Sequence, residues 1–259
     1  MDLEGKVVVV TGSTTGIGKA IAKEAADQGA NVLVTGRDAE RGQAVAQSIG
    51  NSAVFHEDNL EDPHSAERII SKAVASFGKL DALVNNAAWV LRADLDSTDA
   101  ELFTRVMNVN VRSPFLLIKA ATPHLRQTKG CVVNIGSVNG FGGERNLLPY
   151  SVSKGALMTL SKNLADALAA QQVRLYHFNV GWVLTENEYD YKLADGLPEN
   201  WPDQLTSTEI PSGKMTTPAQ IANAVSFWLS ERARPFSGTV MELEQYPFEG
   251  RNPTREEPS

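Results

Sequence analysis

The stretch Lys-Val-Val-Val-Val-Thr-Gly-Ser-Thr-Thr-Gly-Ile-Gly, residues 6–18, joins a β-branched run to a glycine-rich turn. A run of consecutive β-branched residues is typical of a strand that is buried on both faces of a parallel sheet. Glycines in the following turn allow a tight bend and a close approach of the backbone to a ligand. A helical pattern from Ile17 to Gln28 comes next, and the N–H groups of its first turn suit a pyrophosphate. The stretch therefore predicts the first strand, turn and helix of a dinucleotide-binding fold.

Six further strand-like runs alternate with helical patterns along the chain. We predict strands at residues 31–35, 52–56, 80–84, 131–135, 173–180 and 239–243. Strands that alternate with helices imply a parallel sheet with helices on both faces. We therefore predict a single-domain α/β Rossmann fold over residues 1–246, with a doubly wound seven-stranded parallel sheet. Residues 247–259 are charged and contain prolines, and we predict that they form a C-terminal tail.

Charge and hydropathy exclude several classes of protein. The net charge of -7 and the lack of any Lys/Arg block predict that nucleic acid is not a partner. No apolar run approaches the roughly 18 residues that cross a bilayer, and the N-terminus lacks the basic segment of a signal peptide. We therefore expect a cytoplasmic protein that does not bind membranes. Cys131, the single cysteine, lies in an apolar run and is predicted to be a buried thiol.

Tyr150 and Lys154 stand four residues apart in a helical pattern, and Ser137 precedes them on a glycine-rich loop. On a helix, Tyr150 and Lys154 project from one face. A phenol has a pKa of about 10, and a neighbouring ammonium favours the phenolate, so Tyr150 is predicted to exchange a proton near neutral pH. Ser137 can offer a hydroxyl to the same carbonyl oxygen. In the alternative interpretation, Tyr150 and Lys154 belong to a solvated helix face.

The choice of cofactor depends on the end of the second predicted strand. Gly36 and Arg37 follow it, about 20 residues past the glycine loop, where such a fold receives the adenine ribose. Gly36 has no carboxylate for the ribose hydroxyls, whereas Arg37 suits a 2′-phosphate. The sequence therefore favours NADP, with NAD as the alternative. In a competing interpretation, Arg37 is a solvated loop residue and Asp38 caps the helix that runs to Ile49.

Several motifs, in this order, resemble the short-chain dehydrogenase/reductase family. The spacing Gly12-x-x-x-Gly16-x-Gly18 is similar to the family's cofactor loop, and Asn85-Asn86-Ala87-Ala88 is similar to its Asn-Asn-Ala-Gly segment. Ser137 precedes Tyr150 by thirteen residues, which is similar to the family's spacing. The resemblance covers Lys6 to Leu243. It implies an NAD(P)-dependent oxidoreductase that acts on CH-OH groups and moves a hydride between the nicotinamide and a secondary alcohol or ketone.

The resemblance also implies four catalytic roles. Ser137 orients the substrate oxygen, Tyr150 transfers the proton, and Lys154 lowers the pKa of the phenol and holds the nicotinamide ribose. Asn110 completes a proton relay through its backbone carbonyl. Asn110 lies inside a predicted helix, residues 103–125, in which Pro114 predicts a kink or a local break.

The family's cofactor contacts carry over onto the glycine loop, the strand ends and the stretch after the sixth strand. These residues are Gly12, Ser13, Thr14, Thr15, Gly16, Ile17, Gly18, Arg37, Asp58, Asn59, Asn86, Ala87, Tyr150, Lys154, Gly181, Val183 and Thr185. By the same resemblance, Asp58 contacts the adenine amine and Thr185 contacts the amide or phosphates of the cofactor. The helices of Asn110 and Tyr150 often form a subunit interface in the family, which implies a homo-oligomer, either a tetramer or a dimer.

Residues 185–215 form an insertion that is rich in aromatic residues, prolines and carboxylates. We expect a lid that walls the substrate pocket together with Glu144, Arg145 and Trp182. This mixture suggests a polar hydroxylated small molecule such as a sugar derivative. His177 is expected in the core, and no metal site is predicted because no second ligand stands at a suitable spacing. Two alternatives stay open: an epimerase or dehydratase that recycles its cofactor, and a dinucleotide-sensing protein without turnover.

Overall fold

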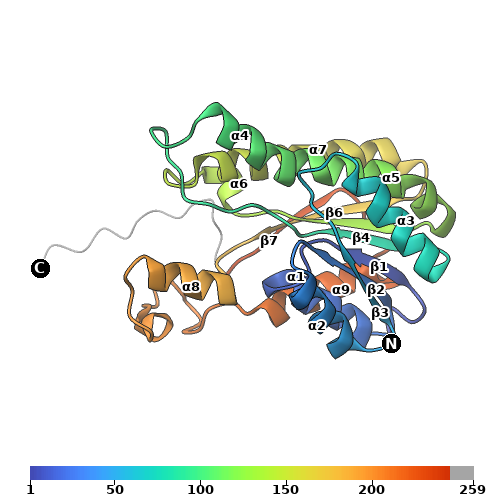
Figure 1. The fold of residues 1–259 in the computed structure, drawn as a ribbon, viewed down its shortest axis with the longest axis horizontal. Helices are drawn as coiled ribbons and strands as arrows, with labels where there is room; N and C mark the ends of the chain where they lie inside the picture. Colours follow the sequence, from blue (N-terminus) through green and yellow to red (C-terminus); the bar gives the residue numbers. More distant parts are fainter. Residues whose placement is uncertain (246–259) are drawn as a thin grey trace, which may run out of the picture.

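Seven strands form one sheet in the order β3-β2-β1-β4-β5-β6-β7, and every neighbouring pair is parallel (Figure 1). They are β1 Val7–Val10, β2 Asn31–Gly36, β3 Ala53–Glu57, β4 Ala82–Asn85, β5 Cys131–Ile135, β6 Arg174–Val180 and β7 Thr239–Leu243. The predicted doubly wound sheet is confirmed. This computed structural model describes residues 1–245, so the predicted tail at 247–259 lies outside the described residues.

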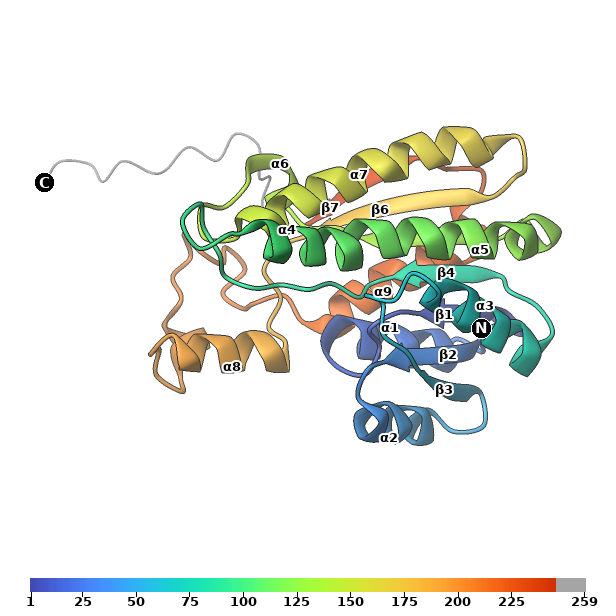
Figure 2. The ribbon, with the colours of Figure 1, turned by 45° about the horizontal axis from the view of Figure 1, so that its top comes forward.

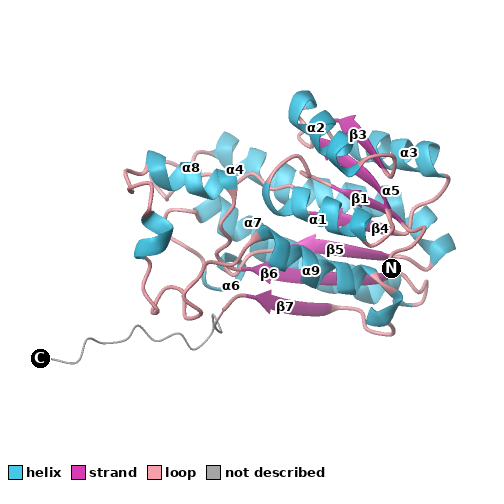
Figure 3. Cartoon of the chain, turned by 90° about the horizontal axis from the view of Figure 1, so that it is seen from below, coloured by secondary structure: helices cyan, strands magenta, loops and turns pink. Residues whose placement is uncertain are grey.

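Helices cover both faces of the sheet (Figures 1 and 3). One face carries α1 (Gly16–Asp27), α2 (Ala39–Ile49) and α9 (Pro218–Leu229), and the other carries α3 (Ser65–Phe77), α5 (Ser113–Thr128) and α7 (Leu148–Ala169). Successive side chains of a strand point to opposite faces. Val8 and Val10 of β1 pack in the first core, and Val7 and Val9 pack in the second. This two-sided burial explains the unbroken valine run.

The helical segment that carries Asn110 is interrupted. Helix α4 (Ala100–Met107) is followed by a π-turn, Asn108–Arg112, and then by α5, whose first turn holds Pro114. The predicted break is therefore confirmed. Proline has no N–H and suits the start of the new helix. Single π-turns are frequent at functional sites, and this one lies beside the cleft described below.

Residues 185–215 lie beyond the carboxyl ends of the strands and include a helix, α8 (Glu186–Ala194), that the sequence pattern did not indicate (Figure 2). A 3₁₀ turn, Trp201–Gln204, follows it. Trp201 is fully buried and packs with Ile210 and Met215 in a small core of its own. A second short helix, α6 (Asn139–Gly142), lies between β5 and α7. The insertion is therefore a folded unit with its own apolar centre.

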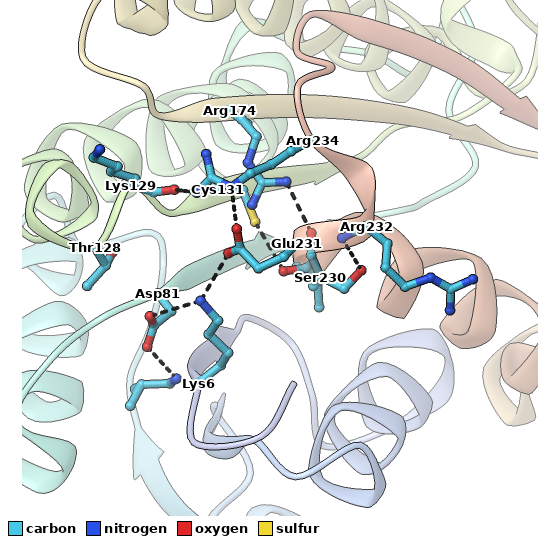
Figure 4. A network of polar contacts seen from close by, with 12 residues as sticks. Lys6, Asp81, Thr128, Lys129, Cys131, Arg174, Ser230, Glu231, Arg232 and Arg234 are labelled. Atoms are coloured by element: carbon cyan, nitrogen blue, oxygen red, sulfur yellow. Dashed lines mark hydrogen bonds and ion pairs between the residues drawn. The ribbon is translucent and has the colours of Figure 1, made fainter. Parts of the chain in front are cut away.

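A network of ion pairs closes the opposite end of the sheet (Figure 4). Lys6 Nζ lies 3.1 Å from Glu231 Oε1 and 3.7 Å from Asp81 Oδ1, and Arg234 also pairs with Glu231. These contacts join the start of the chain to the 3₁₀ turn Glu231–Ala233 after α9. Cys131 is buried next to them, as predicted, and burial raises the pKa of its thiol to about 11.

Candidate active site

A cleft lies at the carboxyl ends of the central strands, which is where open α/β sheets bind ligands. It runs from the glycine loop, across the end of β4, to the start of α7. Predicted site residues that line it are Gly12, Thr14, Thr15, Gly16, Ile17, Gly18, Arg37, Asp58, Asn59, Asn86, Ala87, Ser137, Tyr150, Lys154, Gly181 and Thr185. Gly12 and Thr185, which are 173 positions apart in the sequence, thus meet in one groove.

Three predicted site residues lie behind the walls of the cleft. The hydroxyl of Ser13 donates to the Val10 carbonyl at 2.7 Å and accepts from the Thr35 N–H at 3.0 Å. Val183 packs in the apolar core. Asn110, which is described below, is 1% exposed. Their side chains support the cleft from behind.

The glycine turn is held tightly against the end of β4. Gly12 has a φ of 61°, and a Cβ there would come within 2.8 Å of the Ala87 Cα. The amide nitrogen of Asn86 donates to the carbonyls of Thr11 and Gly12 at 2.9 and 3.1 Å. A side chain at Gly12 is therefore excluded by both conformation and space, and Asn86 fixes the shape of the turn.

The start of α1 is free to receive an anion. Thr15, its N-cap residue, makes no side-chain capping bond, and the first turn contains no acidic residue. The first N–H groups of a helix have no partner within it, and they carry the positive end of the helix dipole. A pyrophosphate fits this position, so the residues suit a nicotinamide dinucleotide.

Ser137 and Tyr150 meet at the other end of the cleft. Both side chains line this part of the cleft, and the Ser137 hydroxyl is near enough to the phenol of Tyr150 to lower its pKa. Burial acts in the opposite direction and is stronger, and the negative charge of Glu188 adds to it, so that the pKa of Tyr150 is raised to about 12. The lowering of this pKa that was expected from Lys154 does not outweigh burial in the protein alone, and proton exchange by Tyr150 near neutral pH stays a prediction. Burial destabilises the charged phenolate more than its neighbours stabilise it.

Lys154 lies on the same face of α7 as Tyr150 but is directed at the sheet. Its Nζ donates to the Ile135 carbonyl at 2.7 Å, and it lies 5.5 Å from the centre of the Tyr150 ring. Lys154 is 2% exposed, and burial lowers the pKa of its ammonium to about 8. The ammonium is therefore held at the end of β5, one residue before Gly136 and two before Ser137.

Asn110 uses its side chain to fix the loop that follows β4. Its Oδ1 accepts from the Trp89 N–H at 2.7 Å, and its Nδ2 donates to the Trp89 carbonyl at 3.1 Å. The same Nδ2 donates to the Ser153 hydroxyl at 2.9 Å. Asn110 therefore ties the π-turn to the loop after β4 and to the residue next to Lys154. A polar side chain in the middle of a helical segment is explained by these contacts.

Among residues 1–245, Arg37 has no ion pair or hydrogen bond at the end of the cleft near β2 and β3, whereas the carboxylate of Asp58 is occupied. Arg37 is exposed and lines the cleft. The side chain of Asp58 is almost fully buried and accepts four hydrogen bonds. The donors are Arg68 Nη2 at 2.6 Å, Arg68 Nε at 2.9 Å, the Asn59 N–H at 2.8 Å and His56 at 3.2 Å. A carboxylate has about four acceptor positions, so these bonds use them. Asp38 caps α2, as the competing interpretation of this segment expected.

The insertion reaches the cleft through Thr185 and Asn187, and polar and aromatic side chains lie beside them. The indole N–H of Trp182 donates to Glu188 Oε1 at 2.8 Å, and the Lys192 ammonium lies 5.2 Å from the centre of the Trp182 ring. The Thr185 hydroxyl accepts from the Glu188 N–H at 3.0 Å and thereby caps α8. Glu188 is close enough to Tyr150 for its charge to raise the phenol's pKa. The insertion therefore carries a carboxylate toward the reacting end of the cleft.

The rim predicted from Glu144 and Arg145 is only partly assembled. Both side chains are exposed, and Asn139 Nδ2 donates to Glu144 Oε2 at 3.3 Å. An unpredicted ion pair joins Arg92 to Asp195 at 2.6 Å, so the loop after β4 is linked to the end of α8. Two surface segments about a hundred residues apart had no pattern that could pair them in advance.

Sequence reasoning missed several cleft residues. They include Thr35, Gly36, Leu60, Glu61, Ala88, Trp89, Val90, Val109, Ile135, Gly136, Val180 and Asn187. Trp89 follows the Asn-Asn-Ala-Ala segment directly, and the Arg105 guanidinium lies 4.2 Å from the centre of its ring. Its position next to a strand end was the available signal, because parallel strands deliver the residues after them to the cleft.

Within residues 1–245, no group of three or more His, Cys, Asp or Glu side chains is placed to hold a metal ion. Among the same residues, no helix combines the length and the apolar character needed to cross a bilayer.

Known proteins resemble this chain over most of its length. The family model described as short chain dehydrogenase matches residues 6–194. An uncharacterized oxidoreductase of Thermotoga maritima is 34% identical over 94% of this chain and 98% of its own. L-fucose dehydrogenase of Mus musculus is 34% identical over 88% of this chain and 83% of its own, and a 3-oxoacyl-[acyl-carrier-protein] reductase of Aquifex aeolicus is 34% identical over 93% and 96%. A crystal structure of 3-ketoacyl-(acyl-carrier-protein) reductase from Brucella melitensis, complexed with NADH, superposes with a TM-score of 0.83 at 28% identity, covering 93% of this chain and 97% of that one.

Proposed function

Because this chain belongs to the short-chain dehydrogenase/reductase family and is a nicotinamide-dependent oxidoreductase of alcohols and ketones, we propose that Tyr150 is its acid/base group. The observation that carries this proposal is the position of the Ser137 hydroxyl beside the Tyr150 phenol, both of which line the cleft. The bound nicotinamide supplies the hydride chemistry. The residues of this chain position the substrate and move the proton.

In this proposal, Ser137 and Tyr150 both donate hydrogen bonds to the oxygen of a carbonyl substrate. A phenol with a pKa of about 12 is protonated at neutral pH, so Tyr150 is ready to give its proton to the forming alkoxide. In the direction of alcohol oxidation, the phenol must lose this proton before Tyr150 can act as a base.

Lys154 is proposed to hold the nicotinamide ribose and to keep a positive charge beside Tyr150. Its ammonium is fixed by the Ile135 carbonyl, which leaves two of its three N–H donors for other partners. Asn110 is proposed to support the proton relay from this lysine. Its side chain already holds the Trp89 loop and Ser153, so its backbone carbonyl is the group left for the relay.

We propose that NADP is the preferred cofactor and that Arg37 binds its 2′-phosphate. Arg37 lines the cleft and is exposed, and Gly36 offers no carboxylate to compete for ribose hydroxyls. A Cβ at Gly36 would lie 2.5 Å from the Thr14 methyl group, so an acidic side chain has little room there. NAD is the alternative, and the Brucella reductase named above is complexed with NADH.

The substrate is proposed to be a small polar hydroxylated molecule such as a sugar. Support comes from Glu188, Trp182 and Lys192 on the wall of the insertion, and from the L-fucose dehydrogenases among the relatives. A carboxylate accepts hydroxyl hydrogens, and a flat indole packs against sugar rings. The 3-oxoacyl reductases among the relatives make an acyl thioester the competing substrate.

We propose a homo-oligomer, a tetramer or a dimer, that assembles through α5 and α7. Phe115 and Val152 on these helices are 40% and 46% exposed, and apolar residues in such positions favour association. Light scattering during gel filtration measures the assembly, and a single monomeric species would contradict the proposed oligomer.

A cytoplasmic location is proposed because nicotinamide cofactors are metabolites of the cell interior.

The test is to follow the absorbance of the reduced nicotinamide with NADP(H) and NAD(H) against a panel of sugars, polyols and a 3-oxoacyl thioester. We expect turnover of a hydroxylated substrate or its ketone, faster with the phosphorylated cofactor. Turnover of the thioester alone would overturn the substrate class. A reaction that consumes substrate without changing the amount of reduced nicotinamide would point instead to a recycled cofactor.

A further inference from the structure

A row of buried polar side chains crosses the molecule directly behind the catalytic groups. It consists of Asn85 on β4, Asn134 on β5, Ser161 on α7, and His177 and Asn179 on β6. None is more than 2% exposed. Buried polar groups are costly unless they are hydrogen-bonded, and the mechanism above assigns none of these five a role.

The row is continuous. Asn85 Nδ2 donates to Asn134 Oδ1 at 2.8 Å, and Asn134 Nδ2 donates to the Ser161 hydroxyl at 2.9 Å. The Ser161 hydroxyl lies 2.9 Å from His177 Nδ1, and His177 Nε2 lies 3.0 Å from Asn179 Oδ1. An amide oxygen only accepts, so Nε2 carries the hydrogen in the bond to Asn179. The Ser161 hydroxyl has one hydrogen and two acceptors within reach, His177 Nδ1 and the Leu157 carbonyl at 2.7 Å, so it ties the imidazole to α7.

The imidazole of His177 fills the space beside the residue that precedes Ser137. A Cβ at Gly136 would lie 2.1 Å from His177 Nε2 and 2.6 Å from Asn179 Oδ1. The Gly136 N–H donates to the Phe178 carbonyl at 2.7 Å, so the backbone there is pinned to the strand that carries His177. Glycine is therefore required at position 136 because there is no space for a side chain. Its backbone conformation does not require glycine, since its φ lies outside the left-handed region.

The other contact of His177 reaches the catalytic helix. Ser161 lies seven residues after Lys154, which is two turns of α7 on the same face. Lys154 bonds to the carbonyl of Ile135, the residue before Gly136. His177 therefore touches both elements that must meet for the reaction: the end of β5, with Ser137, and α7, with Tyr150 and Lys154.

We propose that His177 is a positioning residue that sets the spacing between the end of β5 and α7, and so places Ser137 against Tyr150. The proposal rests on the proposed catalytic role of Tyr150. The charged groups that act on the imidazole are Lys154 and Lys162, both on α7. Burial of the ring and these two positive charges lower the pKa of His177 to about 4, which keeps the imidazole neutral at neutral pH.

The test is a cycle of Gly136→Ala, His177→Ala and the double variant, with the exposed His64→Ala as the control. In the native background, Gly136→Ala is expected to lower kcat at least tenfold, because its methyl group and the imidazole cannot occupy one space. In the His177→Ala background, the same change is expected to cost clearly less, because only the contact with Asn179 Oδ1 remains. The Kd for NADPH, measured by its fluorescence, is expected to stay within twofold throughout, because the glycine loop lies at the far end of the cleft.

Two results would overturn the proposal. One is an equal cost of Gly136→Ala in both backgrounds. The other is a His177→Ala variant that melts at a lower temperature yet keeps the native kcat when folded, as expected for a purely structural residue. Failure of the proposed function is distinguishable, since the native protein itself would then show no turnover dependent on Tyr150.

Discussion

Burial determines the chemistry of individual residues in this cleft. The phenol of Tyr150 and the ammonium of Lys154 are displaced in opposite directions, one to a pKa of about 12 and the other to about 8. In both cases the neutral form is favoured, because charge is poorly solvated there. Each group nevertheless has a polar neighbour: the Ser137 hydroxyl lowers the pKa of the phenol, and the Ile135 carbonyl accepts a hydrogen bond from the ammonium. Polar neighbours therefore act on both groups, and burial is the largest influence on their proton affinities.

We predict that deprotonation of Lys154 lowers activity at alkaline pH. Its ammonium is charged below a pKa of about 8 and neutral above it. We expect kcat/KM for carbonyl reduction to fall as pH rises through this value, because that ratio reports the titration of the free enzyme. In Lys154→Arg, the guanidinium stays charged, so the fall in kcat/KM should occur only above pH 10. Rates measured from pH 6 to 10 check this, and a fall in kcat/KM at the same pH in both proteins would contradict it.

We predict that Arg37 determines the preference for NADPH over NADH. Removing the guanidinium in Arg37→Ala takes away a charge-assisted hydrogen bond to a 2′-phosphate, worth roughly 1.5–3 kcal/mol. The Kd for NADPH should rise by about tenfold or more, while the Kd for NADH stays unchanged. Asp38→Ala is the matched control, since Asp38 caps α2 and should affect stability rather than the choice between cofactors. Equal weakening of both cofactors in Arg37→Ala would rule out this role.

At the scale of elements, the insertion behaves as a folded wall. Trp201 stacks on Trp182 and Tyr189 at centroid distances of 5.8 and 6.3 Å, and it fills the small core beneath α8. Trp182 in turn bonds to Glu188, which acts on Tyr150. The order of α8 is thereby linked to the reacting end of the cleft.

Truncating Trp201 should therefore affect the substrate side alone. In Trp201→Ala, the insertion loses its central side chain, a change of about 3–5 kcal/mol in an ordinary core. We expect the substrate KM to rise at least fivefold and limited proteolysis to cleave within residues 185–215, while the Kd for NADPH is unchanged. Exposed Tyr191→Ala on α8 provides the comparison. An unaltered KM would separate the insertion from the substrate.

The sequence predicted most elements, because each depends on local patterns. The valine run of β1, the glycine turn and the stripe of α7 carry their own signals. Helix α8 carried none, since it buries no residue fully and is fixed by a threonine cap and by acidic residues in its first turn. The candidate catalytic residues were predicted from the spacing of Ser137, Tyr150 and Lys154 and from the family resemblance. The saturation of Asp58, the ion pair between Arg92 and Asp195, and the fit of His177 over Gly136 arise from tertiary contacts between distant segments.

At the scale of the whole molecule, we predict that the buried His177 makes the folded protein less stable in acid. Burial lowers its pKa to about 4, whereas a histidine in the unfolded chain titrates near 6.5. Below pH 6.5 the unfolded state binds a proton that the folded state does not, so stability is complete above pH 6.5 and is lost progressively toward pH 4. This difference between the two pKa values corresponds to at most about 3 kcal/mol of the free energy of unfolding.

Urea unfolding at pH 7.5 and pH 4.5 measures this loss. His177→Gln cannot take up the proton, so its free energy of unfolding should change less between the two values than that of the native protein. Glu231→Gln in the ion-pair network of Figure 4 provides a contrast. The Glu231 side chain is 53% exposed, and removing its charge should cost under about 1 kcal/mol. A native protein whose stability is flat from pH 7.5 to 4.5 would contradict the role assigned to His177.

The whole arrangement of sheet, glycine turn and α7 brings one phenol to the cleft, and Tyr150→Phe tests it most directly. The change removes a single hydroxyl, and loss of a general acid typically lowers the rate by about 10²–10⁴-fold. We predict a loss of kcat in that range, with the Kd for NADPH within twofold of the native value. Turnover by the variant at the native rate would contradict the account.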